Sequence, residues 1–225
     1  MNGGWLIDLL ELFYPRYCAV CDERLLTGEE FLCLKCALQM PKIPYDVLRE
    51  RLYGRIPVDT VASWFEFKRG SPYRKLIHAF KYHGQKELAQ NLGRRFGYEL
   101  KRAGILTDAG MLCPVPLFPA KERKRGYNQS HQLAVGLSAA LEIPVEHENL
   151  VRTGNTSTQT KLNRFERWEN VRNQFCVVKP ELFAGKHLIL VDDVLTTGAT
   201  VEACANAILN CCTVKLSVLT IAAVM

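Results

Sequence analysis

Through most of the chain, short apolar runs alternate with longer segments in which apolar residues recur every three or four positions. A short apolar run bounded by turn residues predicts a buried strand, and the longer period predicts a helix with one buried face. Strands that alternate with helices predict an α/β fold, a mostly parallel sheet with helices on both faces. The predicted strands are residues 58–68, 110–117, 188–191 and 213–224, and the predicted helices are residues 71–82, 86–101, 128–142 and 198–212.

This alternation begins near residue 58, and the segments before it have a different character. Residues 1–45 combine an apolar start with four closely spaced cysteines, and we predict an N-terminal helix followed by a small zinc-binding module there. Residues 46–57 are predicted to be a connector, and residues 58–225 the α/β domain. The N-terminal helix is expected to dock through an apolar face made of Trp5, Leu6, Leu9, Leu10 and Phe13.

Four of the nine cysteines form two Cys-x2-Cys pairs separated by eleven residues, namely Cys18, Cys21, Cys33 and Cys36. Two such pairs supply four soft thiolates at a spacing that closes a tetrahedral Zn²⁺ site. Because four protein ligands leave no open coordination position, we predict a structural metal, not a catalytic one. The other five cysteines lie in apolar stretches and are predicted to be small buried hydrophobes: Cys113, Cys176, Cys204, Cys211 and Cys212.

Composition is typical of a globular protein, with 48% hydrophobic and 23% charged residues. Apolar runs such as residues 216–224 are too short to span a bilayer. The N-terminal stretch carries Asp8 and Glu11 and no basic leader, so we predict no secretory signal and a cytoplasmic location. The net charge is +6, and its densest basic run is KERKR, residues 121–125. Four cations this close repel one another unless an anion binds, which makes the run a candidate anion site.

The segment LILVDDVLTTGAT, residues 188–200, joins two acids to a threonine- and glycine-rich turn. Asp192 and Asp193 follow a predicted strand and are expected at the C-terminal edge of the sheet, where such sheets bind ligands. The turn at residues 196–200 begins a helix, whose free amides and dipole favour a phosphate, and Gly198 allows close approach. The acids require a donor-rich group, such as a sugar diol or a metal ion. A ribose 5-phosphate satisfies both requirements.

Two other interpretations of this segment are weaker. An apolar strand ending in two acids is also found in P-loop nucleoside triphosphatases, but the chain has no Gly-x4-Gly-Lys-Ser/Thr sequence. The segment would also suit a plain strand, turn and helix with Thr196 or Thr197 as the cap. A cap needs one polar residue, whereas this stretch contains three threonines, a glycine and two acids, so a ligand site is favoured.

The same segment resembles the phosphoribosyl-pyrophosphate (PRPP) fingerprint of the type I phosphoribosyltransferases. Together with CPVPLFPAKERKRGYNQS, TQTKLNRFERWENVRNQF and the four-cysteine head, it resembles the competence protein F family (ComF, ComFC, GntX). The likeness covers nearly the whole chain, with four motifs in the expected order. Two positions depart from the family pattern: Phe118, where histidine is frequent and a hydrogen-bond donor is thus missing, and Tyr127, where phenylalanine is frequent.

This resemblance implies a type I phosphoribosyltransferase-like fold with a PRPP site. In that site Asp192 and Asp193 would be the catalytic acids that hold the ribose hydroxyls, and Mg²⁺ would bind together with PRPP. The polar segment that contains Gln159, Leu162, Arg167 and Asn170 would correspond to a mobile hood over the site. The implied phosphate- and pyrophosphate-binding residues are Thr196, Thr197, Gly198, Ala199, Thr200, Lys121, Arg123, Lys124, Arg125 and Arg167.

The resemblance also implies a role in DNA uptake and natural transformation. If the chain is an enzyme, it would be a phosphoribosyltransferase that transfers a pentosyl group from PRPP. The alternatives are a non-catalytic protein that binds single-stranded DNA and a PRPP sensor without turnover. The candidate partners are therefore PRPP or a related ribose 5-phosphate, single-stranded DNA and other DNA-uptake proteins. The sequence indicates neither a general base nor a pocket for an acceptor.

Overall fold

The computed structural model describes residues 15–45, 47–82, 84–153 and 174–225. The predicted N-terminal helix, with the apolar face that ends at Phe13, therefore lies outside the described residues. The predicted hood, including Gln159, Leu162, Arg167 and Asn170, also lies outside them. Among the described residues, no helix combines the length and the apolar character that crossing a bilayer requires.

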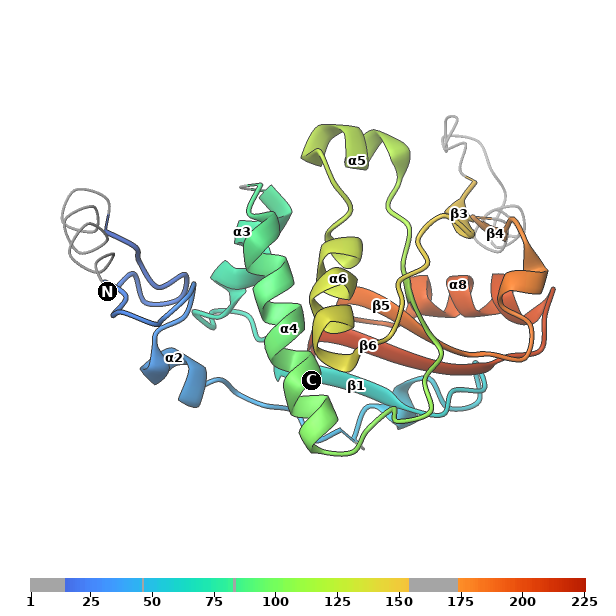
Figure 1. The fold of residues 1–225 in the computed structure, drawn as a ribbon, viewed down its shortest axis with the longest axis horizontal. Coiled ribbons are helices and arrows are strands. Elements are labelled where there is room, and N and C mark those ends of the chain that lie inside the picture. The colour runs from blue at the N-terminus through green and yellow to red at the C-terminus, as the bar shows by residue number, and fades with distance from the viewer. Residues whose placement is uncertain (1–14, 46, 83, 154–173) are drawn as a thin grey trace, which may run out of the picture.

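A four-stranded parallel sheet forms the centre of the fold (Figure 1). Its strand order is β1-β6-β5-β2, and each neighbouring pair is parallel. The two central strands are almost entirely buried, because both of their faces are covered. The strands are β1 (Val61–Glu66), β2 (Met111–Pro114), β5 (His187–Leu195) and β6 (Lys215–Ala223).

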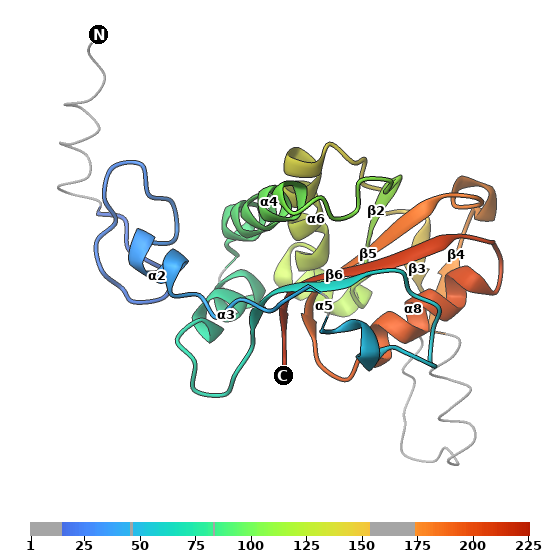
Figure 2. The same cartoon turned by 90° about the horizontal axis from the view of Figure 1, so that it is seen from below.

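Helices cover both faces of this sheet (Figure 2). On one face lie α4 (Lys86–Arg102) and α6 (Gln129–Leu141), with α3 (Arg74–Tyr82) beside α4, and on the other lies α8 (Ala199–Leu209). Ile189 and Val191 of β5 pack in the core of the first face, whereas Leu188 and Leu190 pack in the core of the second. The predicted parallel sheet with helices on both faces is confirmed.

The remaining elements are short. They are α2 (Leu34–Leu38), α5 (Pro119–Arg125), the 3-10 turns η1 (Arg49–Arg51) and η2 (Pro180–Leu182), and the antiparallel pair β3 (Leu150–Arg152) and β4 (Phe175–Val177). The domain boundaries at residues 45 and 57 stay a prediction. One continuous apolar cluster contains both Cys36 of the cysteine-rich segment and Leu76 of α3, so the two parts are in contact.

Several local predictions were wrong. KERKR, which lies outside the four predicted helices, forms most of helix α5, because Pro119 begins a helical turn and Gly126, at φ 81°, ends it. Helix α3 begins at Arg74 and not at residue 71, since residues 71–73 form a turn. Strand β5 continues through both acids to Leu195, because β6 pairs with it over that whole length.

Two further cysteines also depart from expectation. Cys113 and Cys204 are buried as predicted, whereas Cys176 and Cys211 are exposed. Both exposed residues lie in short or terminal segments, Cys176 in β4 and Cys211 in the turn after α8. An apolar stretch that short does not specify which face is covered. Among the described residues there is no cis peptide bond, and Val115–Pro116 is trans.

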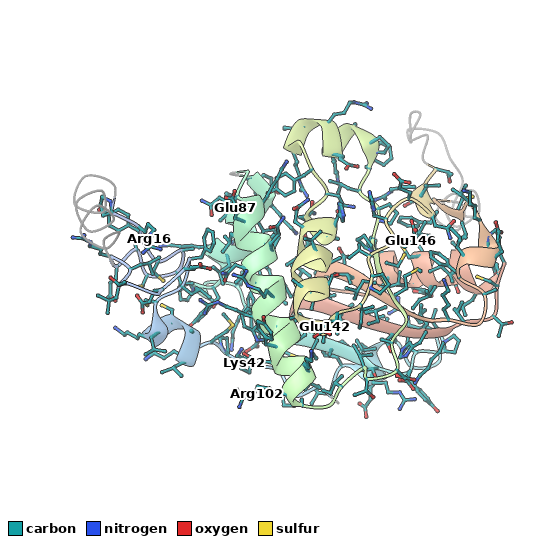
Figure 3. All side chains as sticks on the ribbon, in the orientation of Figure 1. Arg16, Lys42, Glu87, Arg102, Glu142 and Glu146 are labelled. Carbon is teal, nitrogen blue, oxygen red and sulfur yellow. The ribbon has the colours of Figure 1, made fainter. Side chains whose placement is uncertain are left out.

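Glycines allow α4 and α6 to pack with their backbones almost in contact. A Cβ at Gly136 of α6 would lie 2.0 Å from the carbonyl oxygen of Gln90, and one at Gly93 would lie 2.3 Å from that of Leu133. Backbone atoms cannot move aside as a side chain does. Glu142, which follows α6, lies at the end of the helix pair away from α5 (Figure 3). Its Oε1 lies 2.6 Å from Lys101 Nζ of α4.

Gly136→Ala is therefore expected to destabilise the protein, by about 1–3 kcal/mol or more, because the added methyl forces the two helices apart. Denaturant unfolding of the variant measures this free energy. The matched control is Val135→Ala on the exposed side of the same helix, which should change the unfolding free energy far less. Equal losses in the two variants would show that the helices do not depend on this close approach.

Candidate functional site at the C-terminal edge of the sheet

The two acids lie where β5 extends beyond its pairing with β2, while its pairing with β6 continues. Strand β2 pairs with β5 as far as Val191, so Asp192 is the first residue beyond that pairing. Neighbouring residues on a strand point to opposite sides. The two carboxylates consequently have different surroundings, although the sequence presents them as equivalent.

Asp193 points into the layer formed by α3 and α6 and is 6% exposed. Its Oδ2 lies 2.9 Å from Lys81 Nζ and accepts a hydrogen bond from Gln129 Nε2 at 3.0 Å. Gln129 is also buried, and its Oε1 has no hydrogen-bond partner among the described residues. The structure thus places an ion pair and a buried acceptor side by side at this edge.

Asp192 is partly exposed, and the two groups that donate hydrogen bonds to its carboxylate are uncharged. The hydroxyl of Ser130 donates to its Oδ1 at 3.0 Å, and the backbone amide of Asp193 donates to the same atom at 2.8 Å. Burial, followed by the negative charge of Asp193, raises the pKa of Asp192 to about 7, against the lowering effect of these hydrogen bonds and of Lys81. Its charge is therefore sensitive to pH near neutrality.

The turn after the acids leads directly into helix α8. Thr196, Thr197, Ala199 and Thr200 are exposed, and Gly198 is buried at φ 79°. Arg55, which precedes β1, holds this turn in place. Its Nη1 donates to the Thr197 carbonyl at 2.7 Å, and its Nε donates to the Glu202 carboxylate at 3.0 Å. The amide of Ala199, the first residue of α8, donates to the Thr197 hydroxyl at 3.4 Å, so the helix begins at a solvent-facing turn that Arg55 and Thr197 hold in place.

The predicted cations of α5 are only partly gathered at this site. The guanidinium of Arg125 lies 5.4 Å from the ring centre of Tyr82, the residue that follows Lys81. Lys121, Arg123 and Lys124 are exposed, and no ion pair involves them within the described part of the chain. Phe118, the departure noted above, lies under the guanidinium of Arg152 at 5.4 Å. The Tyr127 hydroxyl donates to the Phe80 carbonyl and so ties this loop to α3.

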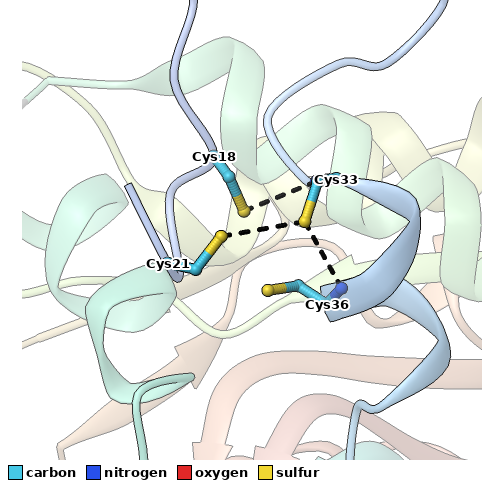
Figure 4. A group of neighbouring side chains, drawn as sticks. All are labelled: Cys18, Cys21, Cys33 and Cys36. Carbon is cyan, nitrogen blue, oxygen red and sulfur yellow. Dashed lines mark hydrogen bonds between the residues drawn. The ribbon is translucent and has the colours of Figure 1, made fainter. Parts of the chain in front are cut away.

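The four predicted zinc ligands come together in the N-terminal segment (Figure 4). Their sulfur atoms all lie within 4.8 Å of one another, and those of Cys21 and Cys33 are 3.7 Å apart. Zn–S bonds of about 2.3 Å in a tetrahedron place sulfurs about 3.8 Å apart, so the cluster fits the ion. The backbone amides of Cys33 and Cys36 donate to the sulfurs of Cys18 and Cys33, each at 3.4 Å. The cluster is therefore compatible with structural zinc.

Comparison with known proteins identifies the family, although no family model matches the chain. The chain is 32% identical to DNA utilization protein YhgH of Escherichia coli over 214 residues, which cover 92% of this chain and 90% of that protein. It is 31% identical to Competence protein F of Haemophilus influenzae, with 84% of this chain and 89% of that protein covered. The chain belongs to the competence protein F family.

A further family member is Competence protein ComFC of Bacillus subtilis, at 30% identity over 86% of this chain and 88% of that protein. Among solved structures, the chain is similar to glutamine PRPP amidotransferase from B. subtilis, with a TM-score of 0.42 and 18% identity. The match covers 62% of this chain and 30% of that one. A hypoxanthine phosphoribosyltransferase from Staphylococcus aureus matches with a TM-score of 0.37 and 13% identity, over 60% of this chain and 63% of that one.

Four side chains at the edge of this competence F family fold were missed by sequence reasoning. Gln129 and Ser130 follow Asn128, whose side chain accepts from the Ser130 amide and caps α6. That polar start of an otherwise apolar helix was a usable signal. Lys81 and Arg55 carried no signal, because they are two of 29 lysines and arginines and their partners lie more than a hundred residues away in the sequence.

Proposed function

We propose that this competence F family protein binds the ribose 5-phosphate part of PRPP, or of a related compound, at the C-terminal edge of the sheet. The observation that supports this most strongly is the continuity of β5, the braced turn and α8. Because of this continuity, the partly exposed carboxylate of Asp192 and the start of α8 at Ala199 are separated by only one short turn. A carboxylate suits sugar hydroxyls, and a helix start suits a phosphate.

In this proposal the acid pair, Asp192 and Asp193, forms the ribose end of the site, and the more exposed carboxylate of Asp192 accepts hydrogen bonds from the sugar hydroxyls. Gln129 holds Asp193 from α6. The 5-phosphate binds at the turn formed by Thr196, Thr197, Gly198, Ala199 and Thr200. Arg125 and its neighbours Lys121, Arg123 and Lys124 face the pyrophosphate end, and Arg167 would join them from outside the described residues. Mg²⁺ bound with PRPP would neutralise charge on the diphosphate.

Turnover, if it occurs, is displacement of pyrophosphate from C1 of the ribose by an acceptor. The protein's part is to hold the two ends of PRPP and to stabilise the departing charge with cations. A sensor would bind PRPP in the same way without releasing pyrophosphate, so a pyrophosphate-release assay separates the two. The names of the relatives support a role in DNA uptake and use, with this site as its ligand-responsive part.

Asp192→Asn is expected to abolish most PRPP binding, because the neutral amide loses the charge that strengthens hydrogen bonds from hydroxyls. Titration calorimetry with PRPP and Mg²⁺ should show a loss of affinity of at least about tenfold, or about 1.4 kcal/mol. The control is Asp59→Asn. Asp59 is an exposed acid just before β1 that pairs with Lys215, so it lies at the N-terminal edge of the sheet, opposite the proposed site. A parent protein that shows no PRPP binding would refute the proposed site.

A second candidate function, binding of single-stranded DNA, is favoured by the exposed cations of α5. Phosphate contacts release counterions, so the affinity should fall steeply with salt concentration. Replacing Lys121, Arg123 and Lys124 with glutamine should weaken binding of an oligonucleotide and reduce the slope of log affinity against log salt by about two to three. Replacing Arg49 and Arg51 of η1 in the same manner is the control. Unchanged slopes would exclude α5 as the contact.

A further inference from the structure

The acid pair of β5 is asymmetric in the groups that surround it. Asp193 is buried and has a cation, Lys81, at 2.9 Å. Asp192 is more exposed, and its hydrogen-bond donors, the Ser130 hydroxyl and the Asp193 amide, are uncharged. Because neighbouring strand residues point to opposite sides, one lysine does not pair directly with both carboxylates.

We propose that Lys81, through its ion pair with Asp193, divides the acid pair into a structural carboxylate, Asp193, and a ligand-binding carboxylate, Asp192. Lys81 is then a positioning residue, since it acts through Asp193 and not on the ligand. The inference rests on the proposed function for the identity of the ligand, a sugar diol. The ion pair itself is a contact within the protein, and it can be tested without any ligand.

Electrostatics explains why the lysine matters to both acids. Without Lys81, the charge of Asp193 would be buried and unpaired, which is strongly unfavourable. The same charge lies beside Asp192, whose pKa is already raised by burial and by Asp193 and is lowered by Lys81. Burial, followed by the charge of Asp192, raises the pKa of the Cys204 thiol on α8, so this thiol is a further titratable group near the acid pair. Removing Lys81 should therefore leave more of Asp192 protonated at neutral pH.

The sign of the effect in the protein alone follows from proton linkage. A carboxyl whose pKa is higher in the folded than in the unfolded state binds its proton more tightly when folded. The unfolding free energy contributed by Asp192 therefore falls as the pH rises from about 4 to about 7. Lys81→Met should extend this decline above pH 7. Asp193→Asn removes the like charge and should move the decline to lower pH. Denaturant titrations across about pH 5 to 9 measure both shifts.

The ligand arm of the experiment uses PRPP with Mg²⁺ as the probe. At about pH 8, Asp192→Asn should lose at least about tenfold in affinity, whereas Asp193→Asn should lose less than about threefold. In Lys81→Met, the midpoint of affinity against pH should move up by at least about half a unit. Lys81→Arg keeps the positive charge, so its midpoint of affinity against pH should equal that of the parent. Lys101→Met, which removes the exposed pair with Glu142, is the matched control and should behave as the parent.

The outcomes separate this inference from the proposed function. Equal affinity losses in Asp192→Asn and Asp193→Asn, or an unmoved midpoint in Lys81→Met, would overturn the division between the acids. If the parent does not bind PRPP, the proposed function fails and the stability profiles decide the inference alone. A Lys81→Met profile that continues to decline above pH 7 supports it, and one parallel to the parent profile overturns it.

Discussion

Cys36→Ser is expected to strip the metal from the N-terminal module and to unfold residues 15–40, while the sheet keeps its fold. Apart from its cysteines, the stretch of residues 15–40 has few buried apolar side chains, namely Val20, Leu25, Leu32 and Met40. Closure of four thiolates around Zn²⁺ therefore supplies much of its folding free energy, on the order of 10 kcal/mol in small zinc modules. Elemental analysis and hydrogen exchange of the module's amides measure the metal content and the loss of structure.

Cys176→Ser provides the matched control for this experiment. Cys176 is an exposed thiol in β4, distant in sequence from the cluster, so its replacement should leave metal content and exchange unchanged. A Cys36→Ser chain whose module stays protected from exchange would contradict the expectation. It would mean that contacts with α3, such as the hydrogen bond from the Tyr73 hydroxyl to the Cys36 carbonyl at 2.8 Å, hold the module without metal.

Gly198→Val should both destabilise the fold and prevent anion binding at the start of α8. At φ 79° a β-branched residue is strained by about 1–2 kcal/mol. A Cβ there would lie 2.7 Å from Cδ2 of Leu52, which is fully buried and has little room to move, and this adds about 1–3 kcal/mol. Denaturant unfolding measures the sum, and calorimetry with PRPP measures the loss of binding.

Gly185→Val separates the two causes. Gly185 has φ 72° and no atom within 4 Å of an added Cβ, so its replacement carries the backbone strain without the clash and lies before β5, away from the turn. We expect it to lose about 1–2 kcal/mol and to bind PRPP as the parent does. If Gly198→Val lost no more stability than Gly185→Val and kept its affinity, the turn would not be a tightly packed anion site.

Local pattern was sufficient for the parts of the structure that depend on neighbours in sequence. The alternating apolar periods predicted the parallel sheet and its covering helices, because burial on one or two faces imposes those periods directly. The paired cysteines predicted the cluster of Cys18, Cys21, Cys33 and Cys36, since ligand spacing and softness are properties of the chain itself. The acids and the turn at residues 196–200 predicted a candidate site, and its ligand stays a proposal.

Tertiary structure alone decided how the acids of that site differ. Pairing with β6 carries β5 through Asp192 and Asp193 to Leu195, and the alternation of a strand then sends the two side chains apart. Lys81 reaches Asp193 from a helix more than a hundred residues earlier, and Arg55 reaches the Thr197 carbonyl from the connector. No local period records such pairings, because they depend on which elements the folded core brings together.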